Sequence, residues 1–336
     1  MNDFKLARIS SVHRGSFSII GEFGEVRAEI TGRLANNAEN SLDFPAVGDW
    51  VNVNYLDGNT FAIIDNINPR TSLLKRKTVG QQTEYQIIAA NIDVAFIIQS
   101  LDANFNINRL ERYLVMINEA RIKPVILLSK KDLVPVSEVG GMIQKIKDGL
   151  NNIEVIPFSN KTKEGFNQIE SLLVTDKTYC LLGSSGVGKS TLLNSLLGEA
   201  VFDTQEVREK DSRGKHTTSR RQLISLKNGA FIIDTPGMRE LGNIDVDNGL
   251  KLTFDEIEII GRNCRFSDCT HTHETGCAVL DAVAIGKLSK TRYMNFIKLR
   301  KENDFNKMTY LDKRRKDKDF GKMVKQVMKG KNKKGL

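Results

Sequence analysis

Apolar and polar positions alternate along the first 70 residues, which is the pattern of strands with one buried face. Both "GEVRAEI" (24–30) and "WVNVNY" (50–55) place an apolar side chain at every second position. Asp57-Gly58-Asn59 is a hairpin turn signal before the next strand, "TFAIID" (60–65). Short alternating strands with no helical run predict a small β-barrel of the OB type over residues 1–70, a class that commonly binds oligonucleotides. A barrel alone does not establish binding.

From Asn91 onward the rhythm changes to apolar strands that alternate with amphipathic helices. Strands are predicted at 92–99, 124–128, 154–158, 178–182, 221–226 and 230–234, and helices at 108–120, capped by Asn108, and at 164–173. This order predicts a parallel sheet in an α/β domain over residues 71–246. The first part of that domain, 71–88, is predicted to be a basic linker. Residues 247–336 are mostly helical in pattern, interrupted by a cluster of cysteines and histidines.

Composition agrees with a globular chain of two or three domains, since 40% of the 336 residues are hydrophobic and 27% are charged. The longest uninterrupted apolar runs are about five residues, far below the roughly 20 that span a bilayer. The N-terminal "MNDFKLARIS" lacks the basic-then-apolar layout of a signal peptide. The sequence therefore predicts a cytoplasmic protein without a membrane segment.

The net charge of +9 is concentrated at the C-terminal end of the chain. Residues 298–336 hold 15 Lys and Arg against 5 Asp and Glu, a local charge of +10. Such a segment favours a polyanionic partner, through neutralisation of phosphates and release of counterions. The alternative is a disordered tail that only keeps the protein in solution.

A phosphate-binding loop is the strongest chemical signal in the sequence. "GSSGVGKS" (183–190) matches G-x-x-x-x-G-K-[ST] and lies after a predicted strand and before a helix, as this loop requires. Glycines permit the tight turn that aims backbone N–H groups at phosphate oxygens, and the helix N-terminus adds positive potential. Lys189 would reach the β- and γ-phosphates, and Ser190 would bind Mg²⁺. The predicted nucleotide contacts in this segment are Gly183, Ser184, Ser185, Gly186, Val187, Gly188, Lys189, Ser190 and Thr191.

Two later segments are candidates for the metal and the γ-phosphate. "FIIDTPG" ends a strand in Asp234, which can hold the magnesium shell, and includes Gly237, whose N–H can meet the γ-phosphate. Between the two motifs, "DSRGKHTTSR" is polar and contains glycine, as a mobile switch should. Thr217 or Thr218 can complete the magnesium coordination there, and His216 is a candidate catalytic residue. A solvated loop is the alternative for this segment.

Two motifs that precede the phosphate loop, "SKKD" and "SNK", each follow a predicted strand. An Asp at the end of a parallel strand can accept hydrogen bonds from N1–H and N2–H₂ of guanine, which adenine cannot match, and a lysine stem can lie over the purine. Parallel strands deliver such loops to the sheet edge that carries the phosphate loop, whatever the order in which the chain visits them. The predicted base contacts are Ser129, Lys130, Asp132, Ser159, Asn160 and Lys161.

Three of the four cysteines lie within fourteen residues, beside two of the four histidines. In a reducing compartment such a cluster favours a metal over disulfides. Cys264, Cys269, Cys277 and one imidazole can form a closed tetrahedral zinc site, which leaves no position for water and is therefore structural. His271 and His273 are both within reach of Cys269, and spacing alone does not choose between them.

With the base motifs before the phosphate loop, a β-rich segment before them and "CRFSDCTHTHETGC" after them, the sequence resembles the RsgA (YjeQ/YloQ) family over essentially its whole length. This resemblance implies an OB-fold RNA-binding domain (1–70), a circularly permuted P-loop GTPase domain (71–246) and a helical zinc-binding domain with a basic tail (247–336). It also implies His271 as the fourth ligand of one structural zinc ion. The implied activity is hydrolysis of GTP to GDP and phosphate with Mg²⁺. The implied context is a monomer that binds rRNA, is stimulated by the small (30S) ribosomal subunit and acts in its late maturation.

The sequence departs from common GTPases at two positions. Ser129 stands where they carry Asn, which predicts that a side-chain hydrogen bond to the base and the neighbouring loop is shortened or lost. Met238 follows "DTPG", where Ras-like enzymes place the Gln that orients water. Both departures keep open a second function, a non-enzymatic RNA-binding protein that senses guanine nucleotides. An ATPase is disfavoured by Asp132.

Overall fold

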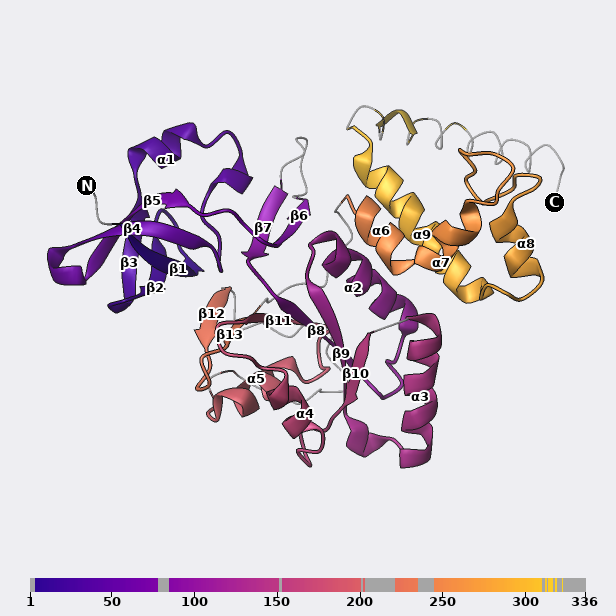
Figure 1. Cartoon of the computed structure of the whole chain (residues 1–336), viewed down its shortest axis with the longest axis horizontal. Helices are drawn as coiled ribbons and strands as arrows, with labels where there is room; N and C mark the ends of the chain where they lie inside the picture. The colour runs from indigo at the N-terminus through magenta and orange to yellow at the C-terminus, as the bar shows by residue number, and fades with distance from the viewer. Residues whose placement is uncertain are drawn as a thin grey trace.

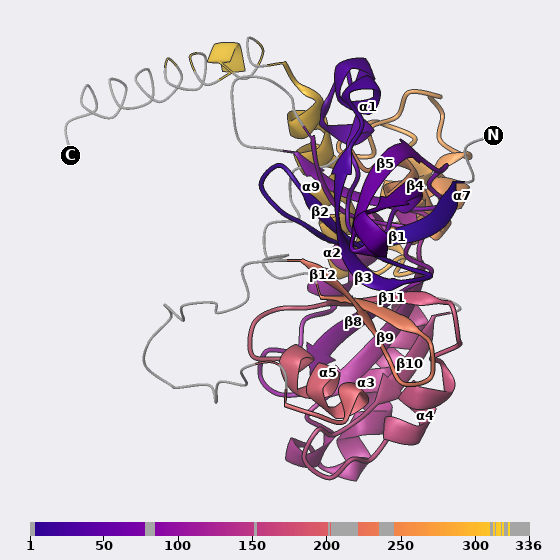
Figure 2. The same cartoon turned by 90° about the vertical axis from the view of Figure 1, so that its left-hand side faces the viewer.

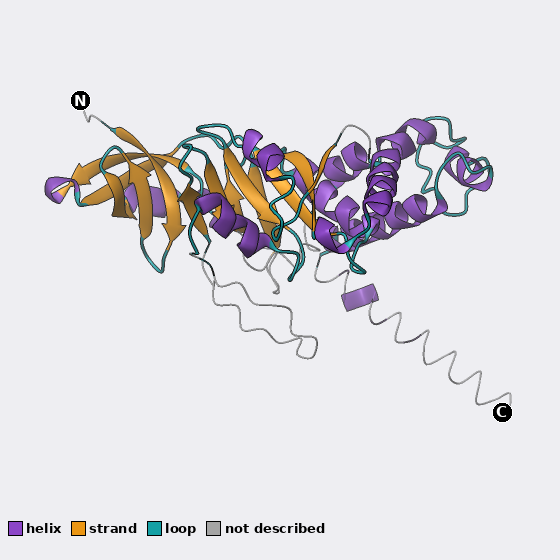
Figure 3. Ribbon diagram, turned by 90° about the horizontal axis from the view of Figure 1, so that it is seen from below, coloured by secondary structure: helices purple, strands orange, loops and turns teal. Residues whose placement is uncertain are grey.

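The structure, a computed structural model, describes residues 4–77, 85–150, 153–200, 202, 221–234, 245–309, 312, 314–316, 318 and 322. A barrel, an α/β domain and a helical part follow one another along the long axis of the molecule (Figure 1 and Figure 3). Among the described residues, no helix combines the length and the apolar character that crossing a membrane requires.

The barrel closes through its first strand. Its strands are β1 (Lys5–Val12), β2 (Phe17–Gly21), β3 (Gly24–Ile30), β4 (Trp50–Leu56) and β5 (Phe61–Ile67), with 3₁₀ turns η1 (Ser41–Asp43) and η2 (Asp57–Asn59). β1 pairs with both β2 and β4, and η2 makes the predicted hairpin between β4 and β5. Alternating apolar side chains fill the interior, where Ile9, Val51 and Ile64 are fully buried. The prediction of no helix was wrong, since α1 (Gly32–Asn37) follows β3, capped by the side chain of Thr31.

The α/β domain is built on a mostly parallel sheet, as predicted. Its strands are β8 (Val94–Ser100), β9 (Lys123–Ser129), β10 (Glu154–Pro157), β11 (Thr178–Leu182), β12 (Gln222–Ser225) and β13 (Phe231–Asp234), in the spatial order β10-β9-β8-β11-β13-β12. Only β12 is antiparallel to its neighbour β13. All the strands predicted for this domain are present.

Helices cover both faces of this sheet. They are α2 (Ile107–Glu119), α3 (Val136–Gly149), α4 (Phe166–Ser171) and α5 (Lys189–Leu197), with the 3₁₀ turn η3 (Lys131–Leu133). Apolar residues of α2 and α3 belong to one core cluster, and those of α4 and α5 to another. The two clusters lie on opposite faces because successive side chains of a strand point to opposite sides of the sheet.

Two local predictions in this domain were wrong. The predicted linker 71–88 contains two strands, β6 (Leu73–Lys77) and β7 (Tyr85–Ala90), which pair antiparallel as a separate small sheet. They form because this basic segment also contains apolar residues, such as Leu74, 1% exposed, whose side chains are buried in the core. Asn106 rather than Asn108 caps α2, because the helix begins earlier than predicted and the Asn106 side chain accepts a hydrogen bond from Arg109 N.

The third part is helical, as the pattern predicted, and packs on α2. Its helices are α6 (Asp247–Thr253), α7 (Asp255–Gly261), α8 (Ala278–Ala284) and α9 (Lys290–Lys307). A Cβ atom at Gly249 of α6 would meet the carbonyl oxygen of Val115 in α2 at 1.8 Å, so the two backbones touch and only glycine fits. Glu119 of α2 accepts a hydrogen bond from the Gly249 N–H at 2.8 Å. Apolar residues from both sides form one continuous core.

The barrel continues the sheet of the α/β domain. Ser11 in β1 pairs antiparallel with Gln222 in β12. Figure 2 shows β12 at the side of the α/β domain that faces the barrel. Arg8, 3% exposed, lies in the same strand and donates to the carbonyl oxygens of Gly48, in the barrel, at 3.3 Å and of Asn91, in the α/β domain, at 3.2 Å. This guanidinium therefore bridges the two parts.

Candidate nucleotide site and metal centre

The phosphate loop joins β11 to α5 in the middle of the sheet. Its glycines have the left-handed conformations that the tight turn needs, with φ of 149° at Gly183 and 93° at Gly188. Gly188 is also closely packed, since a Cβ atom there would lie 2.6 Å from Nδ2 of Asn160. Lys189 Nζ donates to the carbonyl oxygens of Gly183 and Ser184 at 2.8 and 2.7 Å. A cation and the N-terminus of α5 thus lie together, an arrangement that favours phosphate binding.

Both base motifs contact the phosphate loop. Ser129, fully buried at the end of β9, donates its hydroxyl to the carbonyl oxygen of Val187 at 2.7 Å. Asn160 donates from Nδ2 to the carbonyl oxygen of Gly188 at 3.2 Å. The hydrogen bond from position 129 to the neighbouring loop is therefore present despite the shorter side chain. The parallel sheet brings together the three motifs that the sequence separates.

Asp132 is exposed at the same edge and is oriented by a serine. Ser159 Oγ donates to Asp132 Oδ1 at 2.5 Å. The same Oγ accepts hydrogen bonds from the backbone N–H groups of Lys161 and Thr162, each at 3.1 Å. The serine hydroxyl thus holds one oxygen of this exposed carboxylate and leaves the other available to a ligand.

Lys130 is held by an acidic residue that sequence analysis missed. Its Nζ pairs with Asp102 at 2.9 Å, and Asp102 follows β8, the neighbour of β9. Burial by itself would raise the pKa of Asp102. Hydrogen bonds from Lys130, the Asn104 backbone and Ser100 outweigh burial and lower the pKa from its ordinary value to about 2. The ionised carboxylate thus fixes the lysine stem beside the base loop. The signal for it was a polar residue directly after a central strand, at the edge where ligands bind.

One buried atom between the base and phosphate motifs lacks a partner. Oδ1 of Asn160 accepts no hydrogen bond within the described part of the chain. Buried polar atoms are almost always paired, so a donor from a bound ligand, such as an N–H group of guanine, would satisfy it. With the glycine turn and Lys189 for phosphates, and Asp132 for the base, the residues present fit a guanine nucleotide.

Two of the predicted magnesium ligands are described. Asp234 ends β13, which runs parallel to β11, the strand that leads into the phosphate loop. Ser190 is exposed in the first turn of α5. Hydroxyl and carboxylate oxygens suit a hard cation such as Mg²⁺. The other predictions for this side of the site, together with Met238, fall outside the described residues: His216, Thr217, Thr218 and Gly237.

The ligand atoms of Cys264, Cys269, His271 and Cys277 all lie within 4.8 Å of one another. Nδ1 of His271 is 3.5 Å from the sulfurs of Cys264 and Cys277, which are 3.9 Å apart. A tetrahedral zinc ion, with Zn–S of about 2.3 Å and Zn–N of about 2.0 Å, sets such separations at about 3.5 and 3.8 Å, so these three groups fit zinc. Cys269, whose sulfur lies within 4.8 Å of the other ligand atoms, supplies the fourth donor. His273 is exposed and lies outside this group, which agrees with His271 as the fourth ligand.

The surrounding helices hold the cluster in place. Cys277 is the N-cap residue of α8, where its sulfur accepts from the N–H of Leu280 at 3.5 Å. The Tyr293 hydroxyl, from α9, donates to the carbonyl oxygen of His271 at 2.7 Å. His271 itself has a left-handed backbone, with φ of 57°. Two of the ligands are therefore positioned by helices of the third part, and one of these helices, α9, also packs on α2.

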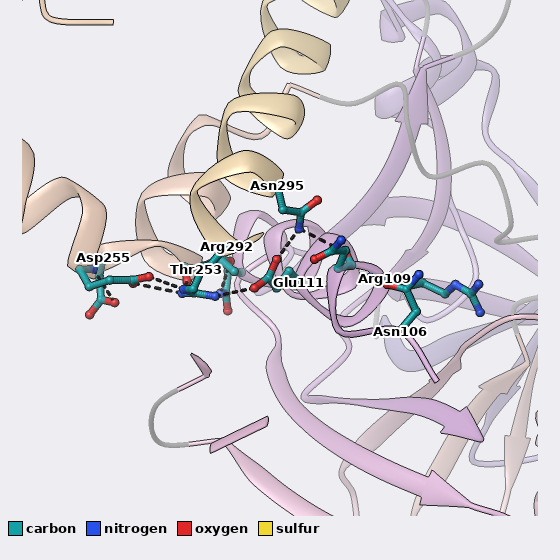
Figure 4. A network of polar contacts seen from close by, with 10 residues as sticks. Asn106, Arg109, Glu111, Thr253, Asp255, Arg292 and Asn295 are labelled. Carbon is teal, nitrogen blue, oxygen red and sulfur yellow. Dashed lines mark hydrogen bonds and ion pairs between the residues drawn. The ribbon is translucent and has the colours of Figure 1, made fainter. Parts of the chain in front are cut away.

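A buried polar network between α2 and the third part was also missed from the sequence. Arg292 of α9 pairs with Glu111 of α2 at 2.8 Å and with Glu256 of α7, and donates to the carbonyl oxygen of Thr253 at 2.6 Å (Figure 4). Asn295 donates to the second oxygen of Glu111. Burial raises the pKa of Glu111, 1% exposed, while hydrogen bonds from Asn295 and Arg292 oppose that shift. The signal was a carboxylate among the apolar positions of an amphipathic helix.

Comparisons with known proteins agree with this geometry. The family model described as RsgA GTPase matches residues 67–244. A Lactiplantibacillus plantarum protein named "Small ribosomal subunit biogenesis GTPase RsgA 2" is 42% identical over 300 residues, 89% of this chain and 84% of the relative. YjeQ from Thermotoga maritima has a similar fold, with a TM-score of 0.65 at 22% identity over 89% of this chain and 98% of that one. YloQ, a circularly permuted GTPase, has a TM-score of 0.65 at 24% identity over 91% and 97%. The chain therefore belongs to the RsgA GTPase family, whose members are hydrolases that act on GTP.

Proposed function

We propose that this chain hydrolyses GTP to GDP and phosphate under stimulation by the small (30S) ribosomal subunit. We further propose that it acts as a monomer that binds rRNA, in late maturation of that subunit in the cytoplasm. The observation that carries the proposal is the meeting of the "SKKD", "SNK" and phosphate loops at one sheet edge, through Ser129, Asn160 and Ser159. The name of the L. plantarum relative supports the ribosomal role.

Residues at the phosphate side would bind and orient the triphosphate. Lys189 would exchange its present carbonyl partners for phosphate oxygens, and the N–H groups of residues 183–191 would surround the β-phosphate. Ser190, Asp234 and Thr217 or Thr218 would hold Mg²⁺, which neutralises developing negative charge when bound. The N–H of Gly237 would contact the γ-phosphate, and His216 is our candidate for the group that positions water.

Residues at the base side would select guanine. The carboxylate of Asp132 would accept hydrogen bonds from the guanine N–H groups, while Ser159 holds it in place. The Lys130 stem, fixed by Asp102, would lie over the purine. We expect Asp132→Asn to reduce the preference for GTP over xanthosine triphosphate by about a hundredfold, because charge-assisted hydrogen bonds of about 1.5–3 kcal/mol are lost. Competition binding measures this, and an unchanged preference would contradict the assignment.

The flanking parts would serve RNA binding. We propose domain boundaries near residues 70 and 246. The barrel and the third part would both bind rRNA. One structural zinc ion would be bound by Cys264, Cys269, His271 and Cys277, and would order the third part rather than take part in hydrolysis. Metal analysis of Cys264→Ala protein checks the ligand set, since undiminished zinc would refute it.

The decisive experiment is phosphate release from GTP with and without purified small subunits. We expect slow turnover alone, because Met238 stands where other GTPases carry the water-orienting Gln, and an increase of about a hundredfold with subunits, the range that a positioned catalytic group supplies. Lys189→Ala is the inactive control. Nucleotide-dependent subunit binding without stimulated phosphate release would favour the alternative, a non-enzymatic guanine-nucleotide sensor.

A further inference from the structure

A cavity of about 1110 Å³ lies between the phosphate loop, the N-terminal end of α2 and the first half of α9. Ser184–Val187 of the phosphate loop line one side of it. The cavity therefore shares these phosphate-loop residues with the predicted nucleotide site, but Lys189, Asp132 and Ser159 are not among the described residues that line it. It is the place where the GTPase domain and the third part face each other across open space.

Positive charge surrounds this cavity. Arg109 and Arg112 of α2 and Lys290 and Lys298 of α9 line it, and no Asp or Glu does so among the described residues. Arg112 is already paired with Glu302, through two hydrogen bonds of 2.6 and 2.9 Å. In the described ranges, the other three cations have no carboxylate partner. Three cations in one concave surface, without counterions in the described part of the chain, favour an anionic ligand.

The cavity is also lined by apolar and amide side chains, which can bind parts of a ligand other than its phosphates. Lys290, Met294 and Lys298 are spaced four residues apart and therefore share one face of α9. Met294 is 56% exposed between the two lysines. On the α2 side the cavity is lined by asparagines, and buried Oδ1 of Asn108 has no partner within the described residues. Cations, an exposed apolar side chain and amides together suit the phosphates, the base faces and the base edges of a nucleic acid.

We propose that this cavity binds a single-stranded segment of RNA, and that this binding is one route by which the small subunit acts on the GTPase; this rests on the proposed function. Single-stranded RNA is favoured because its unstacked bases can reach amide and apolar groups, whereas a regular RNA duplex hides them. The course of the chain supports the same ligand. α9 carries two of the cations, and its second half belongs to residues 298–336, where 15 Lys and Arg, Lys298 among them, stand against 5 Asp and Glu.

Arg109 connects this cavity to the phosphate loop. Its Nη1 donates to Ser184 Oγ at 3.2 Å, while the rest of the guanidinium lies at the cavity. An RNA phosphate in the cavity would accept hydrogen bonds from the same guanidinium of Arg109 that now donates to the phosphate loop. α2 cannot move away freely, because Glu111 is held by Arg292 of α9. RNA bound between α2 and α9 would therefore change the contacts of the phosphate loop directly.

The test compares two charge-matched double variants of the full chain. Lys290→Gln/Lys298→Gln removes the two cavity lysines. Lys287→Gln/Lys301→Gln removes two exposed lysines of the same part that do not line the cavity. GDP affinity and zinc content verify that both proteins are folded. The first readout is the affinity for a short single-stranded RNA as a function of salt, with inorganic phosphate and GDP as competitors. The second is the ratio of phosphate release with subunits to release without them.

We expect the cavity variant to bind RNA roughly tenfold more weakly and to lower the slope of log affinity against log salt by about 1.4, for two lost phosphate contacts on a single strand. The ratio of phosphate release with subunits to release without them should fall by at least the same factor. The control variant should keep the RNA affinity and the ratio of the wild-type chain. Equal losses in the two variants, or none in either, would overturn the assignment. Loss of half of the bound RNA from the control variant, at a phosphate concentration equal to the dissociation constant of phosphate for that variant, would also overturn it, because a simple phosphate site would then account for the binding. If small subunits do not stimulate phosphate release by the wild-type chain, the proposed function is contradicted instead. The RNA affinities of the two variants would still show whether the cavity binds RNA.

Discussion

The two parts that flank the GTPase domain are attached to it in different ways. The barrel has a core of its own, in which all the buried apolar residues come from positions 7–64. The third part has no separate core in the described ranges, because residues such as Phe254, Val279 and Phe296 belong to the same cluster as Leu110 and Leu114 of α2. The barrel therefore has a core of its own, with Val47 alone of its described buried residues in the GTPase-domain cluster, whereas the third part shares its core with the GTPase domain.

The contacts across the two junctions also differ, and those of the third part include a buried ion pair with α2. The barrel meets the α/β domain through the pairing of Ser11 with Gln222, through the bridging hydrogen bonds of Arg8 and through a loop whose Gly48 backbone packs against the carbonyl oxygen of Ala90. The third part meets α2 through backbone contact at Gly249 and through the buried pair of Arg292 and Glu111. We therefore expect two unfolding transitions, one for the barrel and one shared by the GTPase domain and the third part. The nucleotide site and the proposed zinc site should be coupled in stability.

Loss of the metal should have the largest effect. We expect Cys269→Ser to lower the free energy of unfolding of the shared transition by on the order of 5 kcal/mol, less than the about 10–16 kcal/mol of isolated zinc fingers because the apolar core remains. The barrel transition should not move. Differential scanning calorimetry with metal analysis measures both. His273→Ala is the control, since its exposed imidazole lies outside the cluster. An unshifted shared transition in the zinc-free protein would show that the third part unfolds separately.

Breaking the buried ion pair should come next. Arg292→Met leaves Glu111 buried, 1% exposed, without its cation, and should cost about 3–5 kcal/mol in the shared transition. Urea unfolding monitored in the full chain gives this value. Arg292→Met combined with Glu111→Met should recover much of the loss, because the carboxylate that stays charged, Glu256, is partly exposed to solvent. A double variant as unstable as the single one would mean that packing, not charge, holds this junction.

At the barrel junction the corresponding change should be milder. Arg8→Met removes the donor to the Gly48 and Asn91 carbonyl oxygens and should cost about 1–3 kcal/mol. Burial lowers the pKa of Arg8 to about 10, so part of the lost hydrogen bonding is offset by relief of a desolvated charge. The expected readout is a lower barrel transition with little change in the shared one. A larger shift in the shared transition than in the barrel transition would reverse our ranking of the two junctions.

The smallest expected effect concerns the support of the metal ligands. Tyr293→Phe removes the hydroxyl that donates to the His271 carbonyl oxygen at 2.7 Å, which should cost about 1 kcal/mol. Competition with a chelator should show zinc held several-fold more weakly. Tyr113→Phe in α2 serves as a tyrosine control away from the cluster. If zinc affinity is unchanged, the hydroxyl stabilises the third part without positioning the ligand.

Much of the chemistry could be predicted from local sequence. The phosphate loop needs a fixed spacing of glycines and lysine, and the four metal ligands lie within one short segment, so both are visible without a fold. Strand positions followed from apolar runs. Asp102 and Arg109 were not predicted, because each acts on a segment distant in the sequence, at the end of another strand or in the phosphate loop.

By itself the sequence determined the motifs, their permuted order and the three-part division, because these depend on residue type, periodicity and spacing along the chain. Only the tertiary structure decided that Ser129 still reaches the phosphate loop, that residues 71–88 pair as strands, and that Glu111 meets Arg292. These contacts join positions far apart in the chain, and their formation depends on how a shared core places the backbones. For the same reason the cavity between α2 and α9 has no counterpart in the sequence: four cations on two helices become one surface only when those helices pack.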